Sequence, residues 1–310
     1  MPTTGGGDGR EPPLRFVVVH WNQAERCSAT VRRILDDEVP TVVTVVDNDS
    51  RAAELALLRS ALLDEVERGE VEIVPSGRNA GFGPGANVGL QRFLDRVEDG
   101  DWVALCPHDV DLLDGCIRGL LDVVRSEPAA GLACADVGDG MVPVIDPYFG
   151  GMTVPAPGPP PGGPPRWEEV DYPHGTLMLL RRACIAEVGL FDERYFSYCE
   201  EADLALRARS RGWRVGLVRN AGVRNLHLGS SVALVDYLQT RNTVLLVREM
   251  SGRYHATIRA LITLWQVATG VLWPERRPLV FDARARLLGL RDVVLGRMGP
   301  PPAAVLPRDR

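Results

Sequence analysis

Four short apolar runs, each followed by a segment of helical pattern, constrain the fold of this chain more than any other feature. Each run is rich in β-branched residues and ends in polar ones: "LRFVVVHWN", "TVVTVVDNDS", "VEIVPS" and "DWVALCPHDV". Helical patterns follow at 27–39, with Ser28 as a candidate N-cap, and at 51–68 and 83–97. Strands that alternate with helices predict an α/β fold with a doubly wound, mostly parallel sheet. Ligands bind such sheets at the carboxyl ends of the strands, where these polar residues lie.

The composition indicates a globular protein rather than a membrane-spanning or nucleic-acid-binding one. The 310 residues are 45% hydrophobic and 25% charged, and the formal net charge is −6. The sequence contains no run of 18 apolar residues and no signal-peptide pattern, so we expect a cytoplasmic protein. Six cysteines without a Cys-x-x-Cys pair predict reduced thiols in the core.

The second half of the chain is less regular than the first. We expect a disordered, Gly/Pro-rich tail at 1–13 and a second tail at 301–310. The segment 146–170 is also rich in Gly and Pro, and it is either a linker or a long loop over a site. Helical patterns return at 232–273 and 282–296. The most apolar stretch, 261–273, favours a core or subunit-interface helix over a membrane-surface contact.

The stretch "FSYCEEADLALR" places Glu200, Glu201 and Asp203 within four positions. Acidic residues are favoured in the first turn of a helix, and Asp203 and Arg207 have the spacing of a helical ion pair. This structural explanation accounts for Asp203. Two adjacent glutamates behind aromatic residues also fit a partly buried turn, where a carboxylate of altered pKa can act as a general base. Both interpretations stay open on the pattern alone.

Other polar residues at predicted strand ends suggest a phosphate or metal site. Asp109 and Asp111 are two residues apart, which on a strand places them on the same side as ligands for magnesium or manganese. A solvated turn explains them equally. The Gly-rich "GRNAGFGPGANVG" lets a backbone approach a ligand at a helix N-terminus, but it is no dinucleotide fingerprint. Asp47 is either a turn residue or an acceptor for a base or sugar hydroxyl. A lone His227 is structural unless the Asp109 site lacks a ligand.

Taken in order, these pieces resemble the family 2 glycosyltransferases, especially their rhamnosyl- and galactofuranosyltransferase-like branch. The resemblance covers about Phe16 to Arg297 and is carried by "VVVHWN", "VVDNDS", "GRNAGFGPGANVGL", "GLFDERYFSYCEEADLALRARSRGWRV", "HLGSSV" and "YLQTRNTVLLVRE". It implies a GT-A fold with a catalytic domain over 14–230 and a C-terminal helical segment over 231–300. Within that domain, 14–112 is the nucleotide-sugar half, 146–170 a flexible acceptor loop and 171–230 the acceptor half.

The same resemblance implies the reaction and its partners. A sugar would pass from a dTDP- or UDP-sugar to a hydroxyl of a glycan, lipid-linked or small-molecule acceptor, in one inverting displacement assisted by manganese or magnesium. Two alternatives remain, a sugar nucleotidyltransferase and a nucleotide-sugar-binding protein on a transferase scaffold. The loop "HWNQAERC" lacks the glycines that a nucleotidyltransferase places after its first strand. A homodimer and a peripheral membrane contact are further options.

The resemblance also implies a role for each site residue. Glu201 stands at the position of the catalytic base, which is usually Asp, so Glu200 is the alternative base or an acceptor contact. The metal motif, usually Asn-Pro-Asp or Asp-Asp-Asp, reads Pro107-His108-Asp109 here. The implied metal ligands are Asp109, His227 and Asp111. The implied donor-binding residues are Asn22, Asp47, Arg78, Asn87 and Asp109. The residues implied to support or close the acceptor side are Asp203, Tyr237, Arg241 and Asn242.

Overall fold

The computed structural model describes residues 12–146, 152–155, 162–225 and 231–306. Several sequence predictions therefore lie outside the described residues: the tail up to residue 11, the parts of the 146–170 segment at 147–151 and 156–161, the metal ligand His227, and 307–310. The division into domains expected from the sequence stays a prediction.

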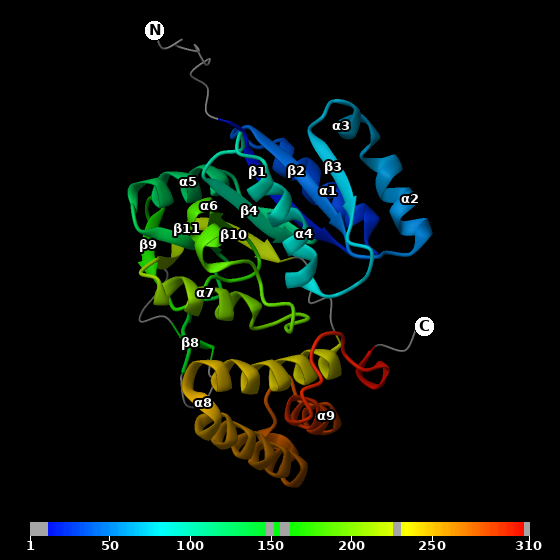
Figure 1. Ribbon diagram of the computed structural model, residues 1–310, viewed down its shortest axis with the longest axis vertical. Coiled ribbons are helices and arrows are strands. Elements are labelled where there is room, and N and C mark those ends of the chain that lie inside the picture. Colours follow the sequence, from blue (N-terminus) through cyan, green and yellow to red (C-terminus); the bar gives the residue numbers. More distant parts are fainter. Residues whose placement is uncertain (1–11, 147–151, 156–161, 226–230, 307–310) are drawn as a thin grey trace.

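A single large mixed sheet forms the centre of the molecule (Figure 1). Its strand order is β3-β2-β1-β4-β10-β6-β11-β5, with β9 paired to β11. The first four apolar runs form the parallel strands β1 (Leu14–His20), β2 (Thr41–Asp47), β3 (Val71–Pro75) and β4 (Trp102–Pro107). In this register His20 lies opposite Asp47 at the carboxyl ends of β1 and β2.

The second half of the chain completes the sheet with strands of both directions. The strands β6 (Ala130–Asp136) and β11 (Arg214–Asn225) are parallel to each other. Three short strands run antiparallel to their neighbours: β5 (Val110–Leu112), β9 (Arg166–Glu169) and β10 (Met178–Arg181). A separate hairpin joins β7 (Met141–Pro143) to β8 (Thr153–Pro155). The predicted α/β class with a mostly parallel sheet is confirmed.

Helices cover both faces of the sheet, which explains the nearly continuous apolar runs. Phe16 and Val18 of β1 belong to one buried cluster, whereas Val17 and Val19 belong to the cluster on the other face. The first cluster lies under α1 (Ala24–Leu35), α2 (Ala52–Ala61) and α5 (Cys116–Ser126). The second lies under α4 (Phe82–Asp95), α6 (Arg182–Val188) and α7 (Glu200–Ser210). The short α3 (Leu63–Glu67) continues α2.

The start of the first helix differs from the sequence prediction. Helix α1 begins at Ala24, and its N-cap residue Gln23 makes no side-chain cap. Ser28 lies one turn inside the helix, where its hydroxyl donates to the carbonyl of Glu25. The N-cap assignment to Ser28 is therefore wrong. The earlier start could not be recognised from the sequence, because the N-cap residue Gln23 is not a typical capping residue.

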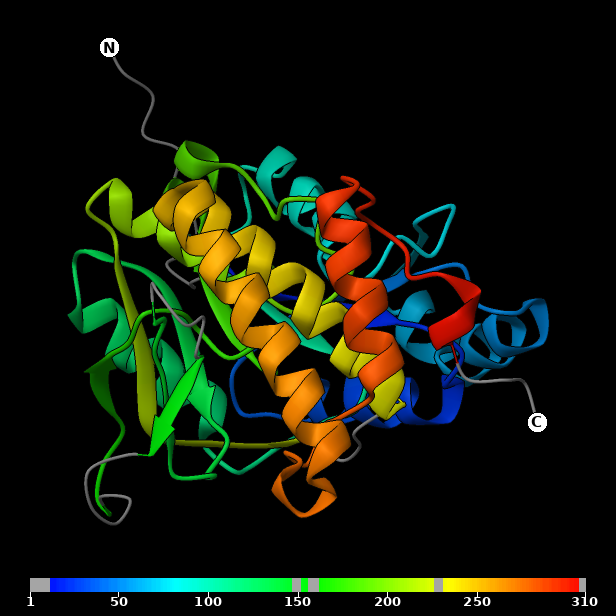
Figure 2. The ribbon, with the colours of Figure 1, turned by 90° about the horizontal axis from the view of Figure 1, so that it is seen from below.

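Two long helical segments follow the sheet, as the sequence predicts for 232–273 and 282–296. Helix α8 (Val232–Leu272) is interrupted at Gly252, whose φ of 81° and ψ of 176° are not helical. After a 3-10 turn at Pro274–Arg276, α9 (Ala283–Val294) packs along α8, and a last 3-10 turn follows at Ala303–Val305. The two halves of α8 and α9 lie together beneath the sheet in Figure 1 and in front of it in Figure 2, which is seen from below.

The apolar stretch 261–273 is only partly buried. Thr263, Val267 and Gly270 face the interior, but Leu261 and Trp265 on the other side are exposed. A core helix is therefore the wrong interpretation for that side. None of the helices in the described part of the chain is long and apolar enough to cross a membrane.

We predict that Gly89→Ala destabilises the fold by about 1–3 kcal/mol, because this glycine lets α4 lie directly on the sheet. A Cβ at Gly89 would lie 2.4 Å from a methyl carbon of Val17, which is fully buried and has no room to move. Urea unfolding monitored by circular dichroism measures the change.

Gly162→Ala is the matched control, since no atom lies within 4 Å of the added Cβ. We expect the control to stay within about 0.5 kcal/mol of the original protein. Equal stability of the Gly89 variant and the control would contradict the packing argument.

Candidate functional site

The two adjacent glutamates stand at the start of α7, directly after a strained turn. Tyr198 and Cys199 have φ values of 69° and 73°, a region that residues other than glycine rarely adopt. Each such residue costs on the order of 1–3 kcal/mol and persists only when its surroundings hold it. The turn therefore needs external support to present Glu200 and Glu201.

That support comes from the first half of α8. The side-chain amide of Asn242 donates to the carbonyls of both Ser197 and Tyr198 at 2.8 Å. Cys199 is buried, and its Sγ lies 3.9 Å from Oγ1 of Thr243. Asn242 is itself fully buried, so these hydrogen bonds are shielded from competition by water. Asn242, which the sequence predicts as a closing residue, holds the turn that carries the acidic pair.

The two glutamates have different environments. Glu200 is buried, and its Oε2 has no hydrogen-bond partner among the described residues, whereas Glu201 keeps part of its surface accessible. Burial first, and the neighbouring Glu201 carboxylate second, raise the pKa of Glu200 well above its usual range. Burial also raises the pKa of Glu201, to about 7. The pKa of Glu200 is therefore raised well above its usual range, while the pKa of Glu201 lies near neutral pH, where its carboxyl can take up and release a proton.

Asp203 has a structural role that the sequence spacing predicted. Its Oδ2 accepts from Nε of Arg207 at 2.9 Å, and Arg207 also donates to the carbonyls of Val188 and Leu190. The ion pair holds Arg207 in place, and the hydrogen bonds of Arg207 to these carbonyls tie α7 to the end of α6. Asp203 does not cap α7, because this helix has no side-chain cap hydrogen bond.

Tyr237 and Arg241 lie inside the packing of α8 against α9. The Tyr237 hydroxyl donates to Asp292 at 2.8 Å, and Nη1 of Arg241 donates to the Tyr237 oxygen at 3.2 Å. Nε of Arg241 donates to Asn242, but its Nη2 is buried without a partner among the described residues. Burial lowers the pKa of Arg241. This network orients Asn242 from behind.

The Gly-rich segment after β3 contacts the acidic turn through its backbone. The amide of Phe82 donates to the carbonyl of Phe196 at 2.7 Å. Gly81 has a φ of 108°, and a Cβ there would lie 1.8 Å from the same carbonyl oxygen. A Cβ at Gly83 would lie 3.3 Å from Cγ of Glu200. At Gly81, therefore, the close approach predicted for a ligand is made to the protein's own backbone.

Asn87 locks the same two segments together. Its side-chain amide donates to the Phe191 carbonyl at 2.9 Å, and its oxygen accepts from the Phe191 amide at 3.0 Å. Both polar ends of the side chain are thereby engaged with one residue of the acceptor-side loop. The structure gives Asn87 a bracing role beside the predicted donor pocket.

Asp47 is held by a histidine that the sequence reasoning missed. Nδ1 of His20 lies 3.1 Å from Oδ1 of Asp47, and Nε2 of His20 accepts from the amide of Gln23. The proton of a neutral ring is therefore on Nδ1, where it donates to Asp47. Burial lowers the pKa of His20, which favours the neutral ring. The only sequence signal was a histidine ending an otherwise apolar strand.

Two asparagines organise the ends of β1 and β2. Asn22, at φ 52°, accepts from the amide of Arg51 at 2.8 Å. Asn48, which the sequence reasoning also missed, donates to the carbonyl of Gly81 at 2.9 Å. Asn48 thus joins the predicted base-binding loop to the Gly-rich segment.

The candidate metal motif is arranged differently from the prediction. Strand β4 ends at Pro107, His108 and Asp109 form a turn, and Asp111 lies on the antiparallel β5. The two aspartates therefore do not share one strand face. Asp109 is buried, and the buried Nε2 of His108 has no partner among the described residues. The described residues contain no group of three metal-ligating side chains, and His227 lies outside them.

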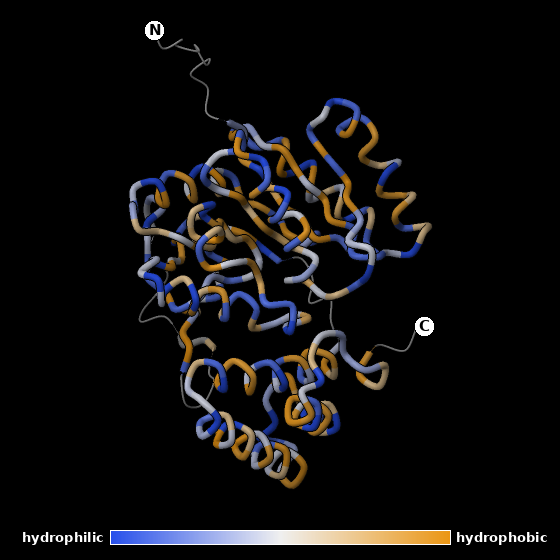
Figure 3. The backbone as a smooth tube through the Cα atoms, viewed as in Figure 1, coloured by the Kyte–Doolittle hydropathy of each residue, from blue (hydrophilic) through white to orange (hydrophobic). Residues whose placement is uncertain are grey.

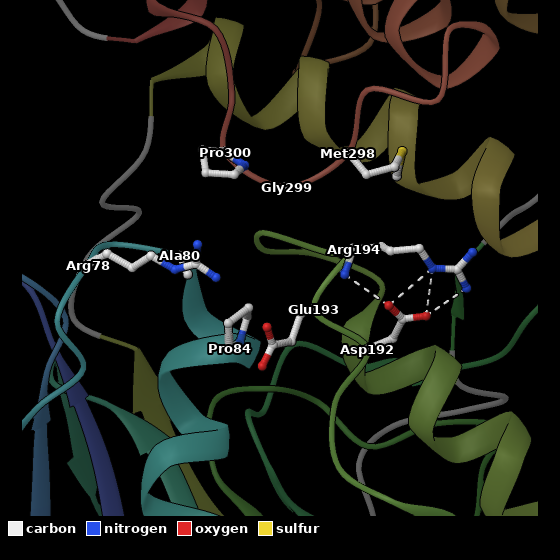
Figure 4. A pocket seen from close by; sticks show the side chains of 9 residues that line it. All are labelled: Arg78, Ala80, Pro84, Asp192, Glu193, Arg194, Met298, Gly299 and Pro300. Atoms are coloured by element: carbon white, nitrogen blue, oxygen red, sulfur yellow. Dashed lines mark hydrogen bonds and ion pairs between the residues drawn. The ribbon is translucent and has the colours of Figure 1, made fainter.

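A pocket of about 380 Å³ lies between the Gly-rich segment after β3, the loop before α7 and the chain after α9 (Figure 4). Its lining residues are Arg78, Ala80, Pro84, Asp192, Glu193, Arg194, Met298, Gly299 and Pro300. Arg78 is exposed and points into it from the Gly-rich segment, while Arg194 is paired with Asp192 at 2.7 Å. The pocket is lined by one predicted donor-binding residue, Arg78, but not by Glu200 or Glu201.

Comparisons with known proteins agree on one class of enzyme. The chain is 28% identical over 188 residues to N-acetylglucosaminyl-diphospho-decaprenol L-rhamnosyltransferase of Mycobacterium tuberculosis, covering 49% of this chain and 58% of the relative. It is 25% identical over 269 residues to a low-salt glycan biosynthesis hexosyltransferase of Haloferax volcanii, covering 82% and 83%. The chain thus spans 58% of the length of the mycobacterial relatives. No family model matches.

Solved structures establish the fold. The mannosyltransferase PcManGT from Pyrobaculum calidifontis, in complex with GDP-Man and Mn²⁺, has a TM-score of 0.57 at 12% identity, covering 96% of this chain and 90% of that one. GalNAc-T7 with UDP, GalNAc and Mn²⁺ has a TM-score of 0.61 at 13% identity, covering 92% and 55%. The fold is a GT-A glycosyltransferase fold. At these identities the likeness concerns the fold alone.

We predict that Glu200→Gln stabilises the protein as the pH rises. The folded protein holds a proton on Glu200 that the unfolded chain releases above its usual pKa of 4.5, so this group costs stability increasingly above that pH. The stability of the variant should match that of the original protein near pH 4.5 and exceed it increasingly as the pH rises to 8. Urea unfolding across this pH range measures the difference.

Glu67→Gln changes an exposed glutamate of α3 and serves as the control, with the same small effect at every pH. A pH-independent difference for Glu200→Gln would show that Glu200 is not held protonated.

We predict that Asn242→Ala loosens the acidic turn. Two half-buried carbonyls lose their donor, which costs on the order of 1–2 kcal/mol, and the strained Tyr198–Cys199 backbone loses its support. Hydrogen exchange measured by mass spectrometry should accelerate over 197–203. Thr257→Ala, on the exposed side of α8, should leave this segment unchanged. Unaltered protection in the Asn242 variant would refute the role assigned to its amide.

Proposed function

We propose that the protein is a glycosyltransferase that moves a sugar from a nucleotide-diphosphate donor to an acceptor hydroxyl with inversion. The observation that carries the proposal is the acidic pair, in which the buried Glu200, whose pKa is raised well above its usual range, lies beside a partly accessible Glu201 with a pKa of about 7. A base poised near the working pH is the most effective general base. The relatives named rhamnosyltransferase and hexosyltransferase support the same class.

The proposed step uses Glu201 as the base. Its carboxylate takes the proton of the acceptor hydroxyl while that oxygen attacks the anomeric carbon. The bond from this carbon to the diphosphate oxygen breaks, and the nucleoside diphosphate leaves. Glu200 cannot fill this role as readily, because it is buried and its pKa is raised well above its usual range. It would contact the acceptor or keep Glu201 in place.

Donor binding is proposed at the ends of β1, β2 and β3. The Asp47 carboxylate, oriented by His20, would accept from the base or ribose of a dTDP- or UDP-sugar, next to Asn22. Arg78 carries an exposed positive charge that suits the diphosphate. Asn87 braces the start of α4 against the backbone of Phe191.

A divalent metal fits this proposal through Asp109. The buried Asp109 carboxylate is a hard oxygen ligand of the kind that magnesium and manganese prefer. Asp111 and His227 remain candidate ligands. When bound, such an ion supplies positive charge for the departing diphosphate. The two solved structures named above contain Mn²⁺.

We propose the acceptor to be a glycan or a lipid-linked sugar. The mycobacterial relative is named for a diphospho-decaprenol acceptor, and the Haloferax relative for glycan biosynthesis. The proposed base lies at the start of α7, directly after the loop 191–199, whose last turn is held by Asn242 of α8.

We predict that Glu201→Gln lowers donor turnover by about a hundredfold or more, because the amide cannot accept the acceptor proton. Nucleotide release from UDP- and dTDP-sugars measures turnover. Melting-temperature shifts with UDP, dTDP and GDP, each with manganese, with magnesium and with chelator, measure binding. The variant should keep the nucleotide shift, whereas Glu67→Gln should keep both shift and turnover.

Full turnover in the Glu201 variant would contradict the assignment of the base. Binding of nucleotide without any turnover by the original protein would favour a nucleotide-sugar-binding protein instead. Dependence of the nucleotide shift on manganese or magnesium would support the Asp109 site.

A further inference from the structure

The second half of α8 carries an exposed apolar stripe that no described residue covers. Its members recur at helical spacing along one side of the helix, and their opposite side packs inward through residues such as Thr263 and Val267. Trp265 is 67% exposed. The exposed large side chains of this stripe are Tyr254, Leu261, Leu264, Trp265, Val271 and Leu272.

The stripe continues beyond the end of α8. Trp273 follows directly, and Leu279 in the connection to α9 is fully exposed. Helix α9 adds Leu287 and Val294 at helical spacing, and Leu295 follows directly after the helix. Figure 2 shows the second half of α8 and α9 side by side on one side of the molecule, and Figure 3 shows apolar positions along both helices. The exposed side chains of residues 253–297 are called the α8–α9 face below.

This face is strongly basic, although the whole chain is acidic. Residues 252–297, all of which the structure describes, contain eight arginines and three acids, while the rest of the chain contains 27 arginines and 38 acids. Among the acids of this segment only Glu275 is exposed, since Asp282 is half-buried and Asp292 is buried. The exposed arginines are Arg253, Arg276, Arg277, Arg284, Arg291 and Arg297.

Aromatic rings and arginines are interleaved on this face. The guanidinium of Arg276 lies 5.6 Å from the centre of the Trp273 ring, and that of Arg277 lies 5.3 Å from the Phe281 ring. Amphipathic surfaces that combine arginine with tryptophan and leucine bind the interfacial region of anionic membranes. A second copy of the chain is disfavoured as the occupant, because it would bring two sets of six arginines together.

We propose that the α8–α9 face docks the protein on an anionic lipid surface. Trp265, Trp273 and Leu279 would enter the headgroup region, and the exposed arginines would contact lipid phosphates. The contact is peripheral. This inference stands apart from the proposed function, because lipid binding is measurable without donor or acceptor.

A buried ion pair connects the α8–α9 face to the candidate site. Arg286 of α9 pairs with Asp236 in the first half of α8 at 2.8 Å and donates to Gln266 in the second half. The first half of α8 in turn holds the acidic turn through Asn242. The face and the turn are therefore parts of one packed unit.

Co-sedimentation of the full chain with vesicles tests the proposal. We expect binding to vesicles of phosphatidylcholine and phosphatidylglycerol, weakened by salt, and little binding to phosphatidylcholine alone. Trp265→Ser should weaken binding about tenfold. Arg253→Gln and Arg284→Gln should each weaken it about fivefold, the effect of roughly 1 kcal/mol per arginine. Melting temperatures show whether each variant is folded.

Val97→Ser and Arg59→Gln are the matched controls, because they remove an exposed apolar residue and an exposed arginine far from the face in sequence. Both should bind vesicles like the original protein. Absence of phosphatidylglycerol-dependent binding would overturn the proposal. So would equal losses in the controls, or a dimer in light scattering that Trp265→Ser dissociates.

Discussion

The backbone contact between Gly81 and Phe196 is the constraint on which the candidate site depends. A Cβ at Gly81 would lie 1.8 Å from the Phe196 carbonyl oxygen, and the next amide, that of Phe82, donates to this same oxygen. The Gly-rich segment after β3 and the loop before α7 are far apart in sequence, yet no side chain fits between them. Each side of the site is positioned by the other.

Several polar side chains reinforce this contact. Asn87 engages both backbone groups of Phe191, and Asn48 joins the Gly81 carbonyl to the end of β2. Asn242 completes the frame from α8 by holding the left-handed turn. All three use the amide, which can donate and accept at once without adding charge near two glutamates. The three amides therefore add no charge of their own beside the glutamates, and the raised pKa values of the glutamates arise mainly from burial.

The α/β class and the mostly parallel sheet could be predicted from the sequence, because the patterns that indicate them follow from physical requirements. Strands buried on both faces must be apolar throughout, and the runs at 14–20 and 41–47 show this. The Asp203–Arg207 pair followed from helical spacing alone. The two segments that became α8 and α9 were clear from their periodicity.

Other features could not be read from the sequence, because they depend on contacts between distant segments. His20 looks like one more strand residue until the register places it opposite Asp47. The arrangement of Asp109 and Asp111 depends on a turn at His108 that local patterns did not indicate. The sequence indicated an apolar helix at 261–273, but the pattern does not state whether a neighbour covers each side of that helix.

The left-handed break at Gly252 has a geometric consequence of its own. Its φ and ψ of 81° and 176° belong to a region that is essentially reserved for glycine. The angle between the two halves of α8 is therefore set by the backbone conformation of this one residue. Arg286 then fixes that angle by bonding to both halves. A substitution of Gly252 would therefore change the tilt of one half of α8 relative to the other. The side chains of the candidate site would keep their chemical groups.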